Sequence, residues 1–238
     1  MSDLSDPELV AREYASLDRF AARRLDRTGW LRGLEEVDVL LGAIAEARPQ
    51  RVLDAGCGAG DWAALVAAPE VVCADQSEAA VEAARARGLE AVRADIEALP
   101  LASESFDLVM CNWVLYHLSD PDLGLRELAR VLRPGGRFVG AYNLPGHLDE
   151  LWSAVGRGPT SDPPNVFDGH NGAEYLARQF ASVERRDTSG EVLWETRDAL
   201  QAYLDAYREL LGQLQAPSRP YPFRASRRNC VFVAEKLR

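Results

Sequence analysis

The sequence predicts an α/β fold built on a mostly parallel sheet of about seven strands, with helices on both faces and a terminal antiparallel strand. Three observations predict it. Short apolar runs alternate with helical segments between residues 51 and 142, which is typical of parallel strands joined by crossover helices. Apolar residues recur at three- and four-residue steps over residues 8–26, which indicates an amphipathic helix before the sheet. The apolar run at 229–235 is the predicted last strand.

The remaining elements follow from the same periodicities and from their start and stop residues. Ser77 is a suitable N-cap for a helix that Gly88 ends. The predicted helices cover residues 34–46, 61–68, 77–87, 122–132, 148–155, 172–179 and 197–215. The predicted strands cover residues 51–55, 71–75, 90–93, 106–112, 137–142 and 181–187, the last of which resumes at 192–194 after a kink at Ser189-Gly190.

We expect these elements to form one domain in three parts. Residues 1–46 are the N-terminal helical cap, residues 47–142 the Rossmann-like core, and residues 143–238 the remainder of the sheet. A chain of 238 residues, 47% of them hydrophobic, can bury such a core without a disulfide or a metal. Helical and loop insertions in the third part are expected to form the substrate pocket.

The composition indicates which binding partners and which cellular compartment we expect. The net charge of −10 disfavours nucleic acid, because nucleic-acid binders usually present a basic face to phosphates. The cysteines lie far apart in the sequence, so they predict no metal site. No apolar run reaches the roughly 20 residues that a membrane helix needs, and the first residues are polar, unlike a signal peptide. We therefore expect a reduced, cytoplasmic protein that does not bind a membrane.

The most informative segment is the glycine-rich loop after the first core strand. Its glycines fall at alternate positions, Gly56, Gly58 and Gly60, where the backbone can turn sharply and approach a ligand. A dinucleotide-binding loop would carry its last glycine where this chain has Asp61, an acid at the place of a pyrophosphate. The Asp54 carboxylate suits a cationic ligand, such as the amino group or sulfonium of S-adenosylmethionine. An NAD-dependent oxidoreductase is therefore the less favoured alternative.

Two further acids follow the second and third core strands. Asp75 stands where a carboxylate can accept both hydroxyl groups of a ribose, although this feature serves NAD equally well. Asp95 stands where a carboxylate can accept the exocyclic amine of an adenine, with Ile96 as an apolar wall. Together with the glycine loop, these residues predict a site for an adenosyl ligand at the carboxyl ends of the strands.

In their order along the chain, three segments resemble the motifs of class I S-adenosylmethionine-dependent methyltransferases. They are VLDAGCGAG at 52–60, VVCADQS at 71–77 and RADIEALPLASESFDLVMCNWVLYHLSDPDLGLRELARVLRPGGRFV at 93–139. The resemblance covers roughly residues 45–142 and is closest to the small-molecule branch that includes the quinone-biosynthesis C-methyltransferases. An ordered series of motifs is far more specific than one glycine loop.

The resemblance implies S-adenosylmethionine as cofactor, S-adenosylhomocysteine as product, and a set of contacts. Residues implied around the methionine part are Asp54, Gly56, Cys57, Gly58, Gly60 and Asn112. The ribose is implied to contact Asp75, and the adenine to contact Gln76, Asp95 and Ile96. Many members close an N-terminal helix over the cofactor, which here would bring in Tyr14 and Arg23.

The expected reaction is methyl transfer to a small organic acceptor, at an oxygen, nitrogen or carbon atom. His117 lies just beyond the fourth core strand, where it could act as a general base or orient a loop. Trp113, Tyr116 and Tyr142 are candidate acceptor contacts. A non-catalytic protein that binds S-adenosylmethionine is a second alternative, because fold does not fix function. We expect a monomer or a homodimer.

Overall fold

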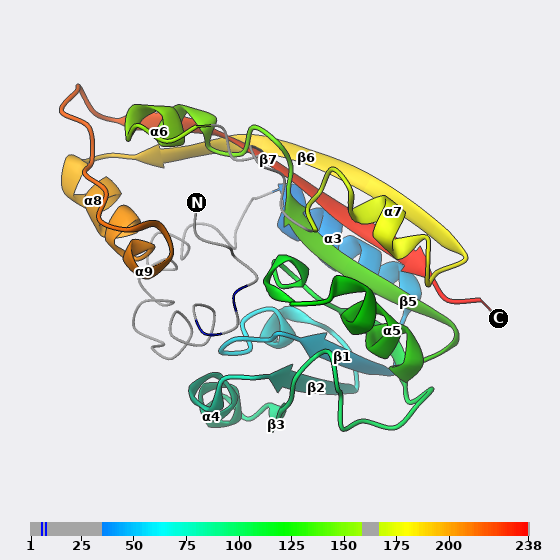
Figure 1. Ribbon diagram of the computed structural model, residues 1–238. Coiled ribbons are helices and arrows are strands. Elements are labelled where there is room, and N and C mark those ends of the chain that lie inside the picture. The colour runs from blue at the N-terminus through cyan, green and yellow to red at the C-terminus, as the bar shows by residue number, and fades with distance from the viewer. Residues whose placement is uncertain (1–5, 7, 9–34, 159–166, 238) are drawn as a thin grey trace.

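The computed structural model describes residues 6, 8, 35–158 and 167–237 and shows one seven-stranded sheet in the order β3-β2-β1-β4-β5-β7-β6 (Figure 1). Neighbouring strands pair in parallel from β3 to β5, and β7 pairs antiparallel with both β5 and β6. The α/β fold and its antiparallel terminal strand are therefore confirmed. The strands are β1 (Arg51–Ala55), β2 (Glu70–Asp75), β3 (Glu90–Arg93), β4 (Phe106–Met110), β5 (Leu132–Asn143), β6 (Ser182–Trp194) and β7 (Phe223–Glu235).

Helices cover both faces of the sheet, because successive residues of each strand point to opposite sides. On one side, which we call the α3 face, Val52 and Met110 pack with α3 (Glu35–Ala47) and α4 (Glu78–Ala86). On the other, the α5 face, Leu53 and Phe138 pack with α5 (Pro121–Val131) and α7 (Gly172–Leu176). Residues two positions apart in one strand therefore share a face of the sheet.

Local sequence explains where the core helices begin. The Ser77 hydroxyl accepts the backbone N–H of Ala80 and caps α4, as predicted. The Asp120 carboxylate accepts the N–H of Leu123 and caps α5, whose first residue is a proline. The predicted bounds of β1 and β3 agree with the structure.

Three predicted helices are shorter than expected, and the one predicted over 172–179 ends at Leu176 as α7. Segment 61–68 contains only the 3-10 turn η1 (Ala63–Leu65), and the chain is extended from Val66 towards Pro69, whose ring disfavours helical backbone before it. The helix predicted over 197–215 ends early as α8 (Arg197–Asp205), followed by α9 (Arg208–Leu211). The Gln201 side chain donates to the Leu214 carbonyl and accepts the N–H of Ala216, so the chain folds back along α8.

The expected kink in β6 is absent, and β7 is longer than the predicted 229–235. Both strands continue without interruption through thirteen paired positions, with Gly190 opposite Arg227. The last pair between β7 and β5 joins Asn229 to Asn143. The outer halves of β6 and β7 therefore continue as a two-stranded ribbon past the carboxyl ends of the parallel strands (Figure 1).

The overhanging ribbon carries its own small core. Trp194 of β6 and Phe223 of β7 pack with Leu200 of α8 and Leu151 of α6 (Asp149–Ala154). In Figure 1, α6, α8 and α9 gather at this end of the molecule, apart from the helices that cover the sheet. This arrangement places a second structural unit beside the edge at which the parallel strands end.

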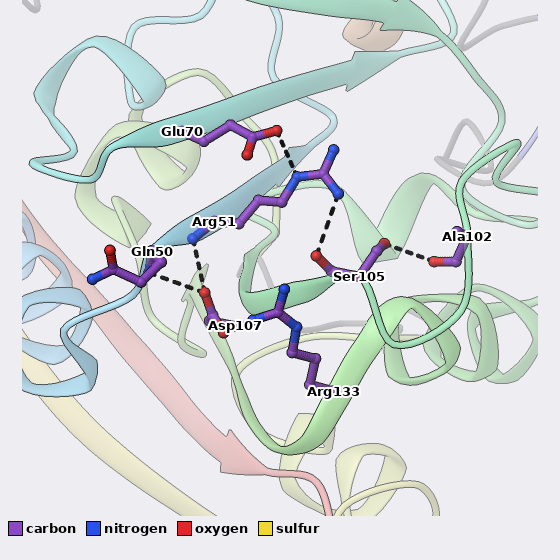
Figure 2. Close-up of polar contacts among 7 residues, drawn as sticks. All are labelled: Gln50, Arg51, Glu70, Ala102, Ser105, Asp107 and Arg133. Carbon is purple, nitrogen blue, oxygen red and sulfur yellow. Dashed lines mark hydrogen bonds and ion pairs between the residues drawn. The ribbon is translucent and has the colours of Figure 1, made fainter.

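The opposite, amino edge of the sheet is held by the carboxylate of Asp107 (Figure 2). One of its oxygens accepts the backbone N–H groups of Gln50 and Arg51 over 3.0 and 2.8 Å. Its other oxygen pairs with Arg133 at 2.7 Å, and Arg51 pairs in turn with Glu70. Asp107 thus links the starts of β1, β4 and β5, far from the ends where a ligand site is expected.

Among the described residues, no helix is both long and apolar enough to cross a membrane. The same part of the chain contains no cluster of three His, Cys, Asp or Glu side chains suited to a metal ion. All four cysteines are buried free thiols.

Candidate functional site

The glycine loop leaves β1 at the carboxyl edge, and all three of its alternate glycines adopt left-handed backbone. Their φ angles are +75° at Gly56, +52° at Gly58 and +77° at Gly60, a region in which other residues are strained. Two of these positions also have no space for a side chain. A Cβ at Gly56 would lie 2.4 Å from Val114, and one at Gly60 would lie 2.4 Å from Leu89. The loop therefore needs glycines for its own shape.

The Asp75 carboxylate ties this loop to the end of β2. One oxygen accepts the backbone N–H of Gly58 at 2.8 Å, and the other accepts the N–H of Ser77 at 2.9 Å. Burial raises the pKa of Asp75, while the hydrogen bonds from Ser77 and Gly58 act in the opposite direction. Each oxygen keeps a second lone pair, so the carboxylate can still accept hydroxyl groups from a ligand.

Asp54 is the least solvated acid of the site. Its side chain is 1% exposed at the end of β1, and its Oδ2 atom has no hydrogen-bond partner within the described structure. Burial, followed by repulsion from Asp75, raises the pKa of Asp54 to about 8, against a smaller opposing effect of the Ala63 backbone N–H. A buried carboxyl with an unused oxygen is costly, and a cationic ligand would relieve that cost.

Asn112 lies beside Asp54. In the register of β1 and β4, Asp54 is opposite Met110, and Asn112 follows two residues later on the same α3 face. The Asn112 Oδ1 atom accepts the N–H of Ala141 at 3.0 Å, which fixes the amide. Its Nδ2 atom is buried and finds no acceptor among the residues that the structure describes. Asp54 and Asn112 therefore offer one unused acceptor and one unused donor side by side.

The residues predicted around an adenine follow β2 and β3, which are neighbours in the sheet. Gln76 and Asp95 are exposed, and Ile96 is buried in the core of the α5 face. The Asp95 Oδ1 atom accepts the N–H of Glu97 at 2.9 Å, as in a local turn. These contacts leave Gln76 and Asp95 at the surface of the same edge as Asp75.

Asp61 does not face the loop as a free acid. Its carboxylate forms an ion pair with Arg87 at the end of α4. This pair fastens the residue after Gly60 to α4, so Asp61 has a structural partner.

The segment after β4 carries the candidate acceptor contacts. Trp113 has a positive φ of 55° and its indole N–H donates to the Asn143 side chain at 2.9 Å. Its ring lies 5.6 Å from that of Trp62, a contact that the sequence did not predict. His117 ends the turn η2 (Leu115–His117), with its ring 4.3 Å from that of Tyr116. All of these rings are partly exposed near the carboxyl edge.

Tyr142 and Cys57 lie in the interior. The Tyr142 hydroxyl donates to the Cys111 carbonyl at 2.7 Å, and its ring packs against Phe167 and Phe232. Tyr142 has no exposed surface and is part of the core on the α5 face. In this structure it therefore cannot contact an acceptor. Cys57 is also buried, with its backbone in the glycine loop.

Comparison with known proteins agrees with this geometry. The model of a family described as "Methyltransferase domain" matches residues 53–140. A malonyl-[acyl-carrier protein] O-methyltransferase of Enterobacter lignolyticus is 38% identical over 184 residues, which are 74% of this chain and 68% of that protein. The chain belongs to the class I S-adenosylmethionine-dependent methyltransferases. Its fold agrees too: a structure from Thermotoga maritima titled as a possible histamine N-methyltransferase superposes with a TM-score of 0.58.

The relatives differ in how much of each chain is aligned. The Thermotoga structure shares 18% identity and aligns over 94% of this chain and 97% of its own, so it shows the fold alone. A demethylmenaquinone methyltransferase of Clavibacter sepedonicus is 41% identical over 104 residues, which are 41% of this chain and 42% of that protein. The chain spans about half the length of several curated relatives that it matches.

The matched region contains most of the predicted site. The family model begins at Leu53 and ends at Gly140, so it includes the glycine loop, Asp75, Asp95 and Asn112. Tyr14 and Arg23, the predicted contacts from the N-terminal helix, lie outside the described residues, as does most of the predicted cap.

Proposed function

We propose that this chain transfers the methyl group of S-adenosylmethionine to a small organic acceptor, at an oxygen, nitrogen or carbon atom. The observation that carries the proposal is the pair of unused buried atoms, Asp54 Oδ2 and Asn112 Nδ2. As a carboxylate, Asp54 can only accept hydrogen bonds, and the amide nitrogen can only donate them. The methionine end of the cofactor offers an ammonium group, a sulfonium and a carboxylate, which complement both atoms.

The rest of the cofactor has matching groups along the same edge. The free lone pairs of Asp75 would accept the ribose hydroxyls, and Gly58 holds that carboxylate in place from the loop side. Asp95 and Gln76 would face the adenine, with Ile96 behind it. Tyr14 and Arg23 of the predicted cap remain proposed contacts above the methionine.

The residues of the chain would act mainly by alignment. When bound, the cofactor supplies a methyl group on a sulfonium, which is already activated for displacement. Asp54 and Asn112 would hold the methionine end at the edge of the sheet, and Trp113 would bound the space that faces it. Holding two reactants in line can supply most of the acceleration in such a reaction. His117 is a proposed general base for acceptors whose nucleophile must lose a proton.

The acceptor pocket is proposed to lie between the parallel strands and the overhanging ribbon. The ribbon and its helices pass the carboxyl edge at the place where Trp113 and Asn143 meet. The acceptors in the names of the relatives are a malonyl group carried on acyl carrier protein and demethylmenaquinone, and both support a small organic group as acceptor here. We propose a monomer or homodimer that needs no nucleic-acid partner.

The proposal can be tested with the intact chain and two matched variants. Calorimetry measures the affinity for S-adenosylhomocysteine, and release of S-adenosylhomocysteine from S-adenosylmethionine reports turnover with a panel of phenols, amines, carboxylic acids and quinols. We expect Asp54→Asn to weaken S-adenosylhomocysteine binding, because an amide cannot carry the negative charge that the ammonium group of the bound ligand would stabilise on Asp54. Asp107→Asn, at the opposite edge, should leave that affinity unchanged.

Two results would contradict the proposal in different ways. If the wild-type chain does not bind S-adenosylhomocysteine, the cofactor assignment is wrong. If it binds the cofactor but no member of the panel is methylated, a non-catalytic binding role is favoured instead.

A further inference from the structure

A row of polar side chains crosses the α3 face of the sheet at its carboxyl edge. Within the named strands, Asn143 follows Val139 and Ala141 on this face, and Asn229 precedes Val231 and Val233 on it. The register pairs Asn229 with Asn143 on one side and with Thr188 on the other. We call the resulting set the polar row, which consists of Asp54, Asn112, Asn143, Asn229 and Thr188.

The outer end of the polar row is buried but not satisfied. Asn229 is 1% exposed and Thr188 is 5% exposed. The Asn229 Oδ1 and Thr188 Oγ1 atoms have no hydrogen-bond partner in the described part of the chain. Buried polar groups are nearly always hydrogen-bonded, and an unsatisfied one destabilises the folded chain. Two such atoms on directly paired residues indicate that a ligand completes them.

A buried ion pair closes the row beside Asn229. Arg227 lies two residues earlier on the same face of β7 and forms an ion pair with Glu36 in the first turn of α3. Both side chains are almost fully buried. The charge of Arg227 is therefore already neutralised, and a carboxylate arriving here would gain little from it while losing its own hydration.

The two ends of the row are linked through Asn143. Its Oδ1 atom accepts the indole N–H of Trp113, the residue after Asn112. Asn143 is exposed, whereas Asn229 next to it is buried. A molecule that enters at Asn143 would thus lie with one end towards Asp54 and Asn112 and the other towards Asn229 and Thr188.

We propose that Asn229 and Thr188 bind the polar end of the methyl acceptor, and that this end is an uncharged hydrogen-bond donor such as a hydroxyl or a primary amide. This inference rests on the proposed function, because it places the acceptor next to the methionine end of the cofactor. It also narrows the substrate class: Asn229 Oδ1 only accepts hydrogen bonds, the Thr188 hydroxyl can accept or donate one, and the neighbouring Arg227 cation is paired with Glu36. A carboxylate at this end would face the acceptor Asn229 Oδ1 without a free positive charge, whereas a hydroxyl or a primary amide can donate to that atom.

Three simple aromatic probes can test the proposal without knowledge of the natural acceptor. Phenol and benzamide carry a neutral donor, and benzoate carries a charge on the same ring. Each is titrated into the chain saturated with S-adenosylhomocysteine, and the side-chain amide signals of Asn229 are followed by NMR. We expect phenol and benzamide to shift these signals and benzoate to bind at least about fivefold more weakly, as expected for one hydrogen bond.

Two variants and a control separate binding from folding. Thr188→Val keeps the volume and removes only the hydroxyl, so we expect the thermal stability to stay the same or rise, since no buried bond is lost. The same change should weaken phenol binding at least about fivefold. Asn229→Leu should abolish it. Ser189→Ala, on the same strand but the opposite, exposed face, should leave phenol binding unchanged.

The outcomes distinguish the inference from the proposed function. Unchanged phenol binding in Thr188→Val and Asn229→Leu, or tighter binding of benzoate than of benzamide, would overturn the inference. Failure of all three probes to shift Asn229, with S-adenosylhomocysteine still bound, would overturn it as well and leave the cofactor site intact. Only loss of S-adenosylhomocysteine binding by the wild-type chain would count against the proposed function itself.

Discussion

The backbone N–H of Gly58 donates to the Asp75 carboxylate over 2.8 Å, which joins the middle of the glycine loop to the end of β2. The carboxylate proposed to hold the ribose is therefore also the group that holds the loop. A second hydrogen bond, from Ser77 at 2.9 Å, fixes its other oxygen. Loop order and cofactor affinity should consequently change together when Asp75 is altered.

The first prediction concerns Asp75→Ala. Loss of charge-assisted hydrogen bonds worth about 1.5–3 kcal/mol should weaken S-adenosylhomocysteine binding about 10- to 100-fold. Calorimetry measures the affinity, and amide hydrogen exchange at Gly58 should speed up in the same variant. Unchanged affinity with faster exchange would show that Asp75 serves the loop alone. Asp107→Ala is the control: it removes the amino-edge contacts and should lower stability without changing affinity.

The second prediction is a pH dependence that arises from Asp54. Its folded pKa of about 8 lies above 3.8, the ordinary pKa of an aspartate, so the folded chain holds this proton more tightly than the unfolded chain does. The unliganded protein should therefore lose stability as pH rises from about 4 to about 8. Denaturant unfolding at several pH values measures the slope, which Asp54→Asn should flatten. A wild-type slope that persists in the variant would assign the effect to other groups.

The third prediction concerns the left-handed backbone of the glycine loop. In Gly56→Ala, a strained φ is combined with a Cβ 2.4 Å from the stiff side chain of Val114. We expect a loss of about 2–4 kcal/mol in the free energy of unfolding. Gly42→Ala is the matched control, because this helical glycine has nothing within 4 Å of its Cβ position and the change should stabilise the chain. Equal effects of the two substitutions would argue against the described loop.

The fourth prediction concerns His117. If it is the general base, His117→Ala should lower kcat about 10²- to 10⁴-fold for an acceptor that must lose a proton. Affinity for S-adenosylhomocysteine should not change, because the proposed cofactor contacts lie elsewhere. The exposed His170 offers a control, since His170→Ala should retain full activity. Full turnover of His117→Ala at every pH would reduce His117 to a structural role.

Local patterns predicted the parts of the fold that depend on local causes. The bounds of β1 and β3 and the Ser77 cap of α4 depend on residues within one element. The length of β7 could not be predicted in this way, because its outer half reads FRASRR and is held as a strand by pairing with β6. The early end of α8 likewise depends on Gln201 and residues more than ten positions later.

The candidate site shows the same division. Motif order predicted Asp54, Asp75 and Asn112, and the structure brings them to one edge of the sheet. The sequence could not show that Asp61 pairs with Arg87, because that contact joins a loop to the end of a later helix. Thr188 and Asn229 were missed for a similar reason. Thr188 lies in a polar stretch and Asn229 precedes an apolar run, and only strand register makes them neighbours.

The pairing of Asn143 with Asn229 marks the boundary between the seven-stranded sheet and the two-stranded ribbon. On one side of it, every strand pair belongs to the ladder that runs from β3 to β6, and on the other only β6 and β7 remain. The segment between residues 189 and 228 can therefore be replaced by another sequence without breaking a hydrogen bond between parallel strands. Substitutions can therefore accumulate in the overhanging ribbon and its helices while the glycine loop and the parallel strands stay the same.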